Sequence, residues 1–249
     1  TNSHIQKVAV LTQYNARSLN EHLNSSKWWN FGRKQGGLYV FTPTITNDNG
    51  YWYRGTADAI YQNMDFLKKS HEPYVVIASG DAVYKMDYSK VLQYHIDKKA
   101  DVTVVCKEMD PSDDVSRFGT IRMDDDMRIT EFEEKPMVTK SNMISTGIYV
   151  IRRRLLIDLI EHAAEEERFD FVNDLKKIYG YKIDHYWSNI ATVDAYYKTN
   201  MDFLKPEVRN YFFKQDPEIY SKVSDLPPAK YNPGASVKNS LVGSGSIIN

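Results

Sequence analysis

The sequence predicts an α/β fold built on a mostly parallel sheet. Three short apolar runs, residues 8–11, 74–78 and 102–106, have the composition of strands that are buried on both faces. Segments with helical periodicity lie between these runs, so strands and helices alternate along the first half of the chain. Such alternation is typical of parallel strands that are joined by helices packed on the sheet.

Hydrophobic periodicity and capping residues place the other elements of the first half. Residues 30–50 contain several glycines and asparagines, which favour irregular connections around one short strand. Asp87 is positioned to cap the helix that follows it. We therefore expect helices at residues 16–23, 57–67 and 88–98, and the short strand at residues 38–41.

The pattern changes in the second half of the chain. Residues 118–123 and 129–133 flank Asp124-Asp125-Asp126, which predicts a hairpin with an aspartate-rich turn. Residues 206–225 are interrupted by prolines and predict a linker with one or two helical turns. Further expected elements are strands at residues 143–151 and 181–187 and helices at residues 153–164 and 193–204, the last capped by Thr192 or Asp194.

The C-terminal tail contains a six-residue spacing between aliphatic residues. Val242 and Ile248 are separated by small residues, as in the hexapeptide repeats of a left-handed parallel β-helix. A plain glycine-serine tail is the alternative, because fewer than two repeats are present. We therefore expect a first domain at residues 1–205, a linker at 206–226 and the start of a left-handed β-helix at 227–249.

Composition excludes several function classes. The net charge of −1 gives no basic surface for nucleic acid or for an anionic membrane. No apolar run approaches the roughly 20 residues of a membrane span. The single cysteine, Cys106, cannot form an internal disulfide and suits a reducing cytoplasm, where we expect the protein. The first strand begins almost at once and the last pattern stops midway, so we expect a fragment of a longer polypeptide.

The predicted helix at residues 57–67 offers a candidate binding site at its start. Thr56 is placed to cap the helix, Gly55 permits a tight turn into it, and Asp58 lies in its first turn. Free N–H groups at such a start can bind an anion or the edge of a nucleotide base. A well-capped amphipathic helix without a ligand is the alternative interpretation.

Residues 52–59 read Trp-Tyr-Arg-Gly-Thr-Ala-Asp-Ala and resemble a motif of the ADP-glucose pyrophosphorylases, the glucose-1-phosphate adenylyltransferases. The resemblance spans nearly all of the chain. It implies a nucleotide-diphospho-sugar transferase domain with a Rossmann-like fold, and a glycine-rich pyrophosphate loop upstream of the first strand seen here. The residues that it assigns to nucleotide binding are Tyr53, Arg54, Gly55 and Thr56.

Asp81 directly follows a buried strand, at the edge where open α/β sheets bind ligands. A carboxylate there can hold Mg²⁺ against substrate phosphates, although a turn aspartate is the commoner outcome. Residues 80–88 resemble the family's Gly-Asp-His-(Ile/Leu)-Tyr-Lys-Met-Asp-Tyr segment, with Ala82 in place of the histidine. The resemblance implies that Asp81 is a metal ligand and a catalytic residue.

Three more segments resemble the family's sugar-phosphate site. Residues 131–136 resemble Glu-Phe-x-Glu-Lys-Pro, residues 145–150 resemble Ser-Met-Gly-Ile-Tyr-Val with Thr146 in place of the methionine, and residues 117–119 resemble Arg-Phe-Gly. By this resemblance Lys135 binds the phosphate of glucose 1-phosphate and Glu134 binds a sugar hydroxyl. The residues assigned to the sugar phosphate are Gly119, Glu134, Lys135, Ser145 and Gly147.

Two departures from the family pattern affect the mechanism. Where the family has Trp-Arg-Asp-(Val/Ile)-Gly-Thr, residues 187–192 place Asn189 at the second magnesium-binding aspartate and Ser188 at the arginine. Loss of that carboxylate should remove a large part of the stabilisation that a metal ion supplies. In a second motif, at residues 170–177, Val172 replaces a glycine. Asp81 is thus the one carboxylate left at an eroded magnesium site.

The resemblance implies the reaction of ATP with glucose 1-phosphate to give ADP-glucose and pyrophosphate, in bacterial glycogen synthesis. The altered metal motif favours a regulatory, weakly catalytic or non-catalytic subunit that pairs with a catalytic paralogue in a heterotetramer. A fully active adenylyltransferase, as a homotetramer, is the alternative. A structural hexapeptide-repeat protein or acyltransferase is disfavoured, because the repeat region is short and no histidine follows it.

Overall fold

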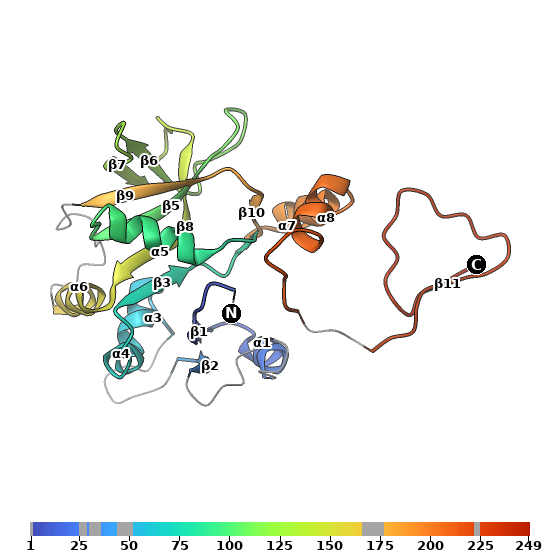
Figure 1. The fold of residues 1–249 in the computed structure, drawn as a ribbon, viewed down its shortest axis with the longest axis horizontal. Coiled ribbons are helices and arrows are strands. Elements are labelled where there is room, and N and C mark those ends of the chain that lie inside the picture. The colour runs from blue at the N-terminus through green and yellow to red at the C-terminus, as the bar shows by residue number, and fades with distance from the viewer. Residues whose placement is uncertain (1, 25–28, 30–35, 44–51, 166–176, 222–224) are drawn as a thin grey trace.

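The fold is centred on β8 (Met143–Arg152), which is hydrogen-bonded to three other strands of a six-stranded sheet (Figure 1). The computed structural model describes residues 2–24, 29, 36–43, 52–165, 177–221 and 225–249. All three neighbours run antiparallel to β8: β3 (Tyr74–Ala78), β5 (Val102–Glu108) and β6 (Gly119–Met123). The other two strands are β7 (Ile129–Glu134), which pairs with β6, and β9 (Ile178–Ile183), which runs parallel to β5.

The expectation of a mostly parallel sheet is therefore wrong. β3, β5 and β9 share one direction, but β8 lies in reverse between β3 and β5. In the described part of this sheet, β5 and β9 form the one parallel pair. Burial on both faces makes a strand apolar whichever way it runs, so composition could not reveal the direction of β8.

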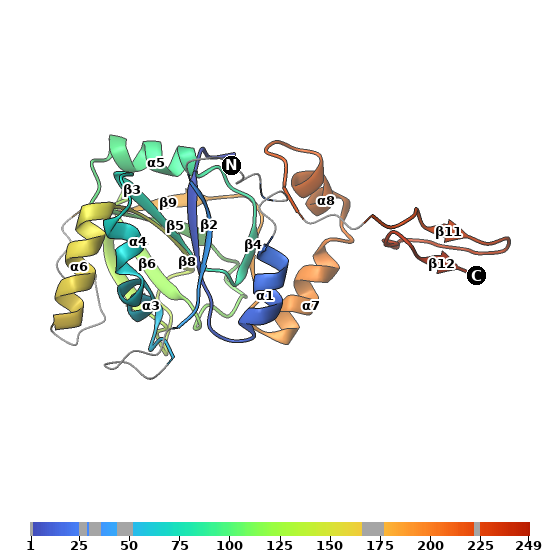
Figure 2. The same cartoon turned by 90° about the horizontal axis from the view of Figure 1, so that it is seen from below.

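Helices cover both faces of the sheet, and alternate residues of β5 contact the two layers. Val104 and Cys106 pack with α4 (Met64–Lys68) and α6 (Arg153–Glu165), whereas Val105 packs with α5 (Tyr88–Asp97). Figure 2 shows α3, α4 and α6 together, apart from α5. This two-sided burial follows from the alternation of side chains along a strand.

Several predicted helix boundaries are confirmed by their capping bonds. Asp87 accepts a hydrogen bond from the Ser89 N–H at 3.0 Å at the start of α5. Thr192 accepts one from the Ala195 N–H at 3.2 Å and caps α7 (Val193–Asp202). Helix α1 (Ala16–Leu23) and helix α6 also lie where periodicity predicted them.

The predicted hairpin is present, and its turn is held by one aspartate. The Asp124 carboxylate accepts hydrogen bonds from the N–H groups of Asp126 and Arg128, at 3.0 and 2.9 Å. These bonds close the turn between β6 and β7.

The helix expected at residues 57–67 is interrupted by one residue. It consists of α3 (Thr56–Gln62) and α4, which are separated at Asn63. The Asn63 side chain donates hydrogen bonds to the Ala59 carbonyl at 2.8 Å and to the Tyr53 hydroxyl at 3.0 Å. Tyr61, expected on the buried face, is exposed on α3.

The strand expected at residues 181–187 is also wrong, because the chain forms two strands there. β9 ends at Ile183, and β10 (Trp187–Asn189) leaves the sheet to pair antiparallel with β4 (Ala82–Tyr84). β4 was not predicted. The two form a separate ribbon at the end of the sheet.

The remaining elements lie at the two ends of the chain. β1 (Lys7–Leu11) and β2 (Gly37–Phe41) form a parallel pair, and both strands were predicted. Helix α8 (Pro206–Phe213) lies within the predicted linker, and its Val208 and Phe212 are buried. β11 (Lys230–Tyr231) and β12 (Ile247–Ile248) pair in parallel, beyond α7 and α8 in both views (Figures 1 and 2). The predicted domain boundaries stay a prediction.

None of the helices in the described part of the chain has the length and apolar character needed to cross a bilayer.

Protein stability should fall in mild acid because of His95. This side chain is 1% exposed, and Nδ1 lies 2.9 Å from the Thr103 hydroxyl. Burial, with a smaller repulsion from Arg152, lowers the pKa of His95 to about 4. The unfolded chain therefore binds a proton below pH 6.5 that the folded chain excludes, which should cost about 2 kcal/mol of unfolding free energy at pH 5. Stability at pH 7 should be unaffected by this proton.

Urea unfolding between pH 7 and pH 5 measures the effect. His95→Gln, which cannot take up the proton, should lose less stability over this range than the wild-type chain. Equal slopes for the two proteins would show that His95 is not responsible.

Candidate functional site

The ribbon of β4 and β10 brings Asp81 and Asn189 together. β3 ends at Ala78, and Asp81 follows after a two-residue turn, directly before β4. In the ribbon Asn189 faces Ala82, and the Ile190 N–H donates a hydrogen bond to the Asp81 carbonyl at 2.7 Å. The two positions thus lie side by side at one end of the ribbon, as the motifs predicted. Their chemical roles stay predictions.

The side chains at this end of the ribbon do not fit a magnesium site made of two carboxylates. The Asp81 carboxylate accepts a hydrogen bond from the Ser79 hydroxyl. The Asn189 side-chain oxygen accepts one from the Ala191 N–H at 3.0 Å, and its other polar atom is an NH₂ donor, which repels cations. No group of three His, Cys, Asp or Glu residues that could hold a metal ion occurs among the residues described. One carboxylate and one amide offer a cation less negative charge than two carboxylates do, and the weakened magnesium site stays a prediction.

A bulge in β8 places the predicted sugar-site strand against Asp81. The register between β5 and β8 shifts after Val105, and Gly147 lies in the bulge with φ +73°. The Gly147 carbonyl accepts a hydrogen bond from the Ser79 N–H at 3.0 Å. A Cβ at position 147 would lie 3.0 Å from the Ser79 Cβ, so glycine permits both the conformation and the close approach. Gly147 therefore supports the turn that carries Asp81.

Thr146 anchors the same bulge from inside. Its hydroxyl donates a hydrogen bond to the Val105 carbonyl at 2.9 Å, and the residue is buried. The bond joins the bulge to β5 at the point where the register shifts. The threonine that replaces the family's methionine is thus a structural residue.

The other predicted sugar-phosphate residues lie on β6, β7 and β8. Gly119 faces Glu134 in the β6–β7 ladder, and Lys135 follows β7 with its Nζ 3.7 Å from a Glu134 carboxylate oxygen. Both charged side chains are exposed, so they remain accessible to a ligand. A Cβ at position 119 would lie 2.7 Å from the Phe132 ring, which accounts for the glycine.

Tyr149 connects this group, and the sequence analysis missed it. Its hydroxyl lies 3.1 Å from the Ser145 hydroxyl. Burial raises the pKa of Tyr149, and the negative charge of Glu134 raises it further. The phenol therefore stays neutral and can donate a hydrogen bond. Tyr149 lies in the segment 145–150, four residues after Ser145, and this position in the motif could have indicated that it contacts Ser145.

The predicted nucleotide-binding segment is held by Asp58. The Asp58 carboxylate is buried, accepts the Arg54 N–H at 2.8 Å and the Gln62 side-chain amide at 2.9 Å, and lies 3.6 Å from the Arg54 guanidinium. This carboxylate therefore fixes the backbone that leads into α3.

The prediction that Thr56 caps this helix is wrong. Gly55 is the N-cap residue, and no side chain there makes a capping bond. Gly55 is extended, and a Cβ at its position would meet nothing within 4 Å. Among the residues that the structure describes, none covers the position of a Gly55 Cβ, and Tyr53 is fixed beside the helix start by Asn63.

The structure thus joins the predicted metal-binding and sugar-phosphate residues, but not the predicted nucleotide-binding residues. The Ser79–Gly147 bond links the sugar-site strand to Asp81 and Asn189, whereas residues 53–56 are anchored separately on α3. Val172 lies outside the described residues.

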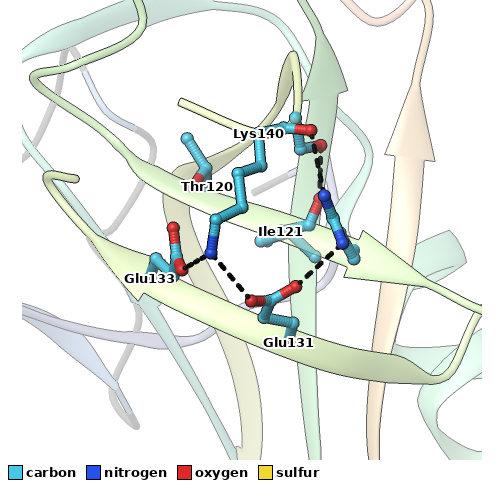
Figure 3. A pocket seen from close by; sticks show the side chains of 7 residues that line it. Thr120, Ile121, Glu131, Glu133 and Lys140 are labelled. Carbon is cyan, nitrogen blue, oxygen red and sulfur yellow. Dashed lines mark hydrogen bonds and ion pairs between the residues drawn. The ribbon is translucent and has the colours of Figure 1, made fainter. Parts of the chain in front are cut away.

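Two hollows on the surface contain none of the predicted site residues. One lies over β6 and β7 and is occupied by its own charged side chains (Figure 3). There Lys140 lies 3.0 Å from Glu133 and 3.7 Å from Glu131, and Arg122 lies 3.3 Å from Glu131. The other lies between α1 and β2. Neither hollow provides a set of groups for catalysis.

The chain is similar in sequence to known nucleotidyl transferases. A family model described as nucleotidyl transferase matches residues 1–206. The glucose-1-phosphate adenylyltransferase of Clostridium novyi is 38% identical over 258 residues, which cover 100% of this chain and 67% of that protein. Its namesake from Thermosipho melanesiensis is 37% identical, with 99% and 62% covered. The Bacillus anthracis protein of the same name is 38% identical, with 99% and 68% covered. The chain thus spans about two thirds of these relatives.

Asp58→Asn should loosen the segment at residues 53–56. Asparagine lacks the negative charge that the N–H and guanidinium of Arg54 contact. We therefore expect a loss of about 1–2 kcal/mol in unfolding free energy. Chemical denaturation measures the loss. Asp65→Asn is the matched control, because Asp65 pairs with Lys69 on the exposed surface and its change should leave the midpoint unaltered. Equal effects of the two substitutions would contradict the anchoring role.

Gly147→Ala should destabilise the fold by about 1–2 kcal/mol, because alanine is strained at φ +73° and its Cβ approaches Ser79. Thermal unfolding measures this effect. Gly80→Ala is the control, since nothing lies within 4 Å of a Cβ there. If both variants unfold at the wild-type temperature, the bulge does not require glycine.

Proposed function

The chain belongs to the nucleotidyl transferase family, and we propose that it forms most of a regulatory subunit of a glucose-1-phosphate adenylyltransferase in bacterial glycogen biosynthesis. The names of the relatives support the reaction class, which joins ATP and glucose 1-phosphate into ADP-glucose and releases pyrophosphate. Such a role places the protein in the cytoplasm.

The observation that carries the regulatory proposal is the amide beside Asp81. Catalysis of phosphoryl transfer is mainly positioning and neutralisation of charge, which Mg²⁺ provides when carboxylates hold it. Asn189 occupies the predicted second metal position, and its oxygen is engaged by the Ala191 N–H. The hydrogen bond between Ile190 and Asp81 keeps the backbone of the two positions together, while the amide lowers the negative charge that would hold the metal. This combination supports a site that binds its ligand and catalyses poorly.

The proposed ligands are ATP or ADP-glucose and glucose 1-phosphate. The exposed Lys135 ammonium would attract the sugar phosphate. The exposed carboxylate of Glu134 and the hydroxyl of Ser145 would bind sugar hydroxyls. The nucleotide would contact residues 53–56, at the open start of α3.

The proposed partner is a catalytic paralogue in a heterotetramer. Residues 227–249 would then begin a left-handed β-helix, which the parallel pairing of β11 with β12 supports, because successive coils of such a helix stack in parallel. A structural hexapeptide-repeat protein is disfavoured, because the nucleotidyl transferase match takes up residues 1–206.

A fully active adenylyltransferase, as a homotetramer, is the second candidate. It is favoured by the retained Asp81, which the ribbon holds at the sheet edge, and by the retained Lys135. In that case the amide of Asn189 would have to be tolerated during turnover.

Assays of the full-length protein separate the two candidates. The wild-type protein alone should form ADP-glucose in Mg²⁺ at least about 100-fold more slowly than the mixture with its catalytic paralogue, because one carboxylate is missing. Asn189→Asp should raise the rate of the protein alone by about tenfold or more, whereas Asn189→Ala, the matched control, should not. Full turnover by the wild-type protein without a partner would refute the regulatory proposal.

A further inference from the structure

Lys85 is a buried cation that joins the end of β4 to helix α8. The residue is 7% exposed, and its Nζ donates hydrogen bonds to the carbonyls of Tyr211 and Gln215, the latter at 2.9 Å. The Nζ also lies 4.7 Å from the centre of the Tyr211 ring, and the Tyr211 hydroxyl donates to the Lys85 carbonyl at 2.6 Å. A cation is favourable at the C-terminal end of a helix, where carbonyls lack partners within the helix.

The same end of α8 also contacts the other strand of the ribbon. The His185 ring stacks on Tyr211 at 6.0 Å, and the Tyr186 ring meets Phe212 edge to face at 5.5 Å. His185 and Tyr186 directly precede β10, and Lys85 directly follows β4. Because the strands are antiparallel, these residues lie at one end of the ribbon.

Asp81 and Asn189 lie at the opposite end. Tyr84 faces Trp187 at the end near α8, and Ala82 faces Asn189 at the far end. Three residues of strand span about 10 Å, so the contacts between α8 and the ribbon lie about 10 Å from the candidate site.

The ribbon needs such an attachment. Within the described chain, β4 and β10 pair with each other and with no strand of the six-stranded sheet. A two-stranded ribbon of three residues per strand is unstable by itself and must be held by packing. Trp187 packs into the core of the main sheet, and the Ser188 hydroxyl lies 2.7 Å from the Thr199 hydroxyl of α7. The reciprocal bonds between Lys85 and Tyr211 add an attachment to α8, and a buried ammonium without its carbonyls would be strongly unfavourable.

We propose that Lys85 and Tyr211 are positioning residues, through which α8 sets the backbone of the Asp81–Asn189 pair and thereby its affinity for a phosphorylated ligand. The affinity part of this inference rests on the proposed function.

The test compares Lys85→Met with Arg209→Met in the full-length protein. Arg209 is the matched control, because its guanidinium donates to the carbonyls of Phe203 and Leu204 at the end of α7. Arg209 is thus a cation that donates to carbonyls at a helix end, as Lys85 does, but its side chain belongs to α8 and its bonds are made to the end of α7, away from the ribbon. Tyr211→Phe, which removes one hydroxyl, serves as the milder variant if Lys85→Met does not fold.

Two readouts distinguish positioning from general stability. In hydrogen exchange of the ligand-free protein, the peptide that contains Ile190 should exchange at least tenfold faster in Lys85→Met, or measurably faster in Tyr211→Phe, than in Arg209→Met. In calorimetric titration with ADP-glucose, the Lys85 variant should bind at least tenfold more weakly, whereas the Arg209 variant should bind as the wild type does.

Equal exchange rates in the Lys85 and Arg209 variants would overturn the positioning role. Unchanged exchange with a lost affinity would overturn it as well, because the ribbon would not be the route. If the wild-type protein binds no ADP-glucose while the exchange responds to Lys85 alone, the proposed function fails and the mechanical inference stands.

Discussion

The antiparallel pairing of β4 with β10 is the constraint on which the candidate site depends. The bond from the Ile190 N–H to the Asp81 carbonyl joins segments that are far apart in the sequence. Because the contact is made by backbone atoms, it does not depend on whether position 189 carries a carboxylate or an amide. A change from aspartate to asparagine therefore alters the charge at this edge and leaves the backbone in place. The charge of the predicted metal site can therefore change while the backbone geometry of the site is kept.

Two buried charges hold the predicted functional segments, and both are hydrogen-bonded to backbone groups at helix ends. Asp58 accepts an N–H at the start of α3, next to the predicted nucleotide-binding residues. Lys85 donates to carbonyls at the end of α8, next to the ribbon that carries Asp81. Each charge has the sign that the helix end favours. Buried charges are therefore used here for position, while the exposed Lys135 and Glu134 remain available to a ligand.

The bulge in β8 adds a second link between segments. It turns Gly147 toward Ser79, while the Thr146 hydroxyl donates to the Val105 carbonyl beside the register shift. Regular pairing at this point would direct the side chains of residues 145–147 alternately to the two faces of the sheet. The bulge instead brings the sugar-site strand against the turn before Asp81, so that one irregularity joins two motifs.

Local physical chemistry in the sequence determined the elements and the motif positions. Strands at β1, β3 and β5, the caps Asp87 and Thr192, and the aspartate turn at Asp124 follow from periodicity and short-range hydrogen bonding. The resemblance also placed Asp81 and Asn189 in one site. Tertiary structure decided the direction of β8, the break at Asn63, the pairing of β4 with β10, and the contacts of Tyr149 and Lys85. Periodicity records which residues are buried, whereas partner, direction and register depend on packing between segments that only the folded chain brings together.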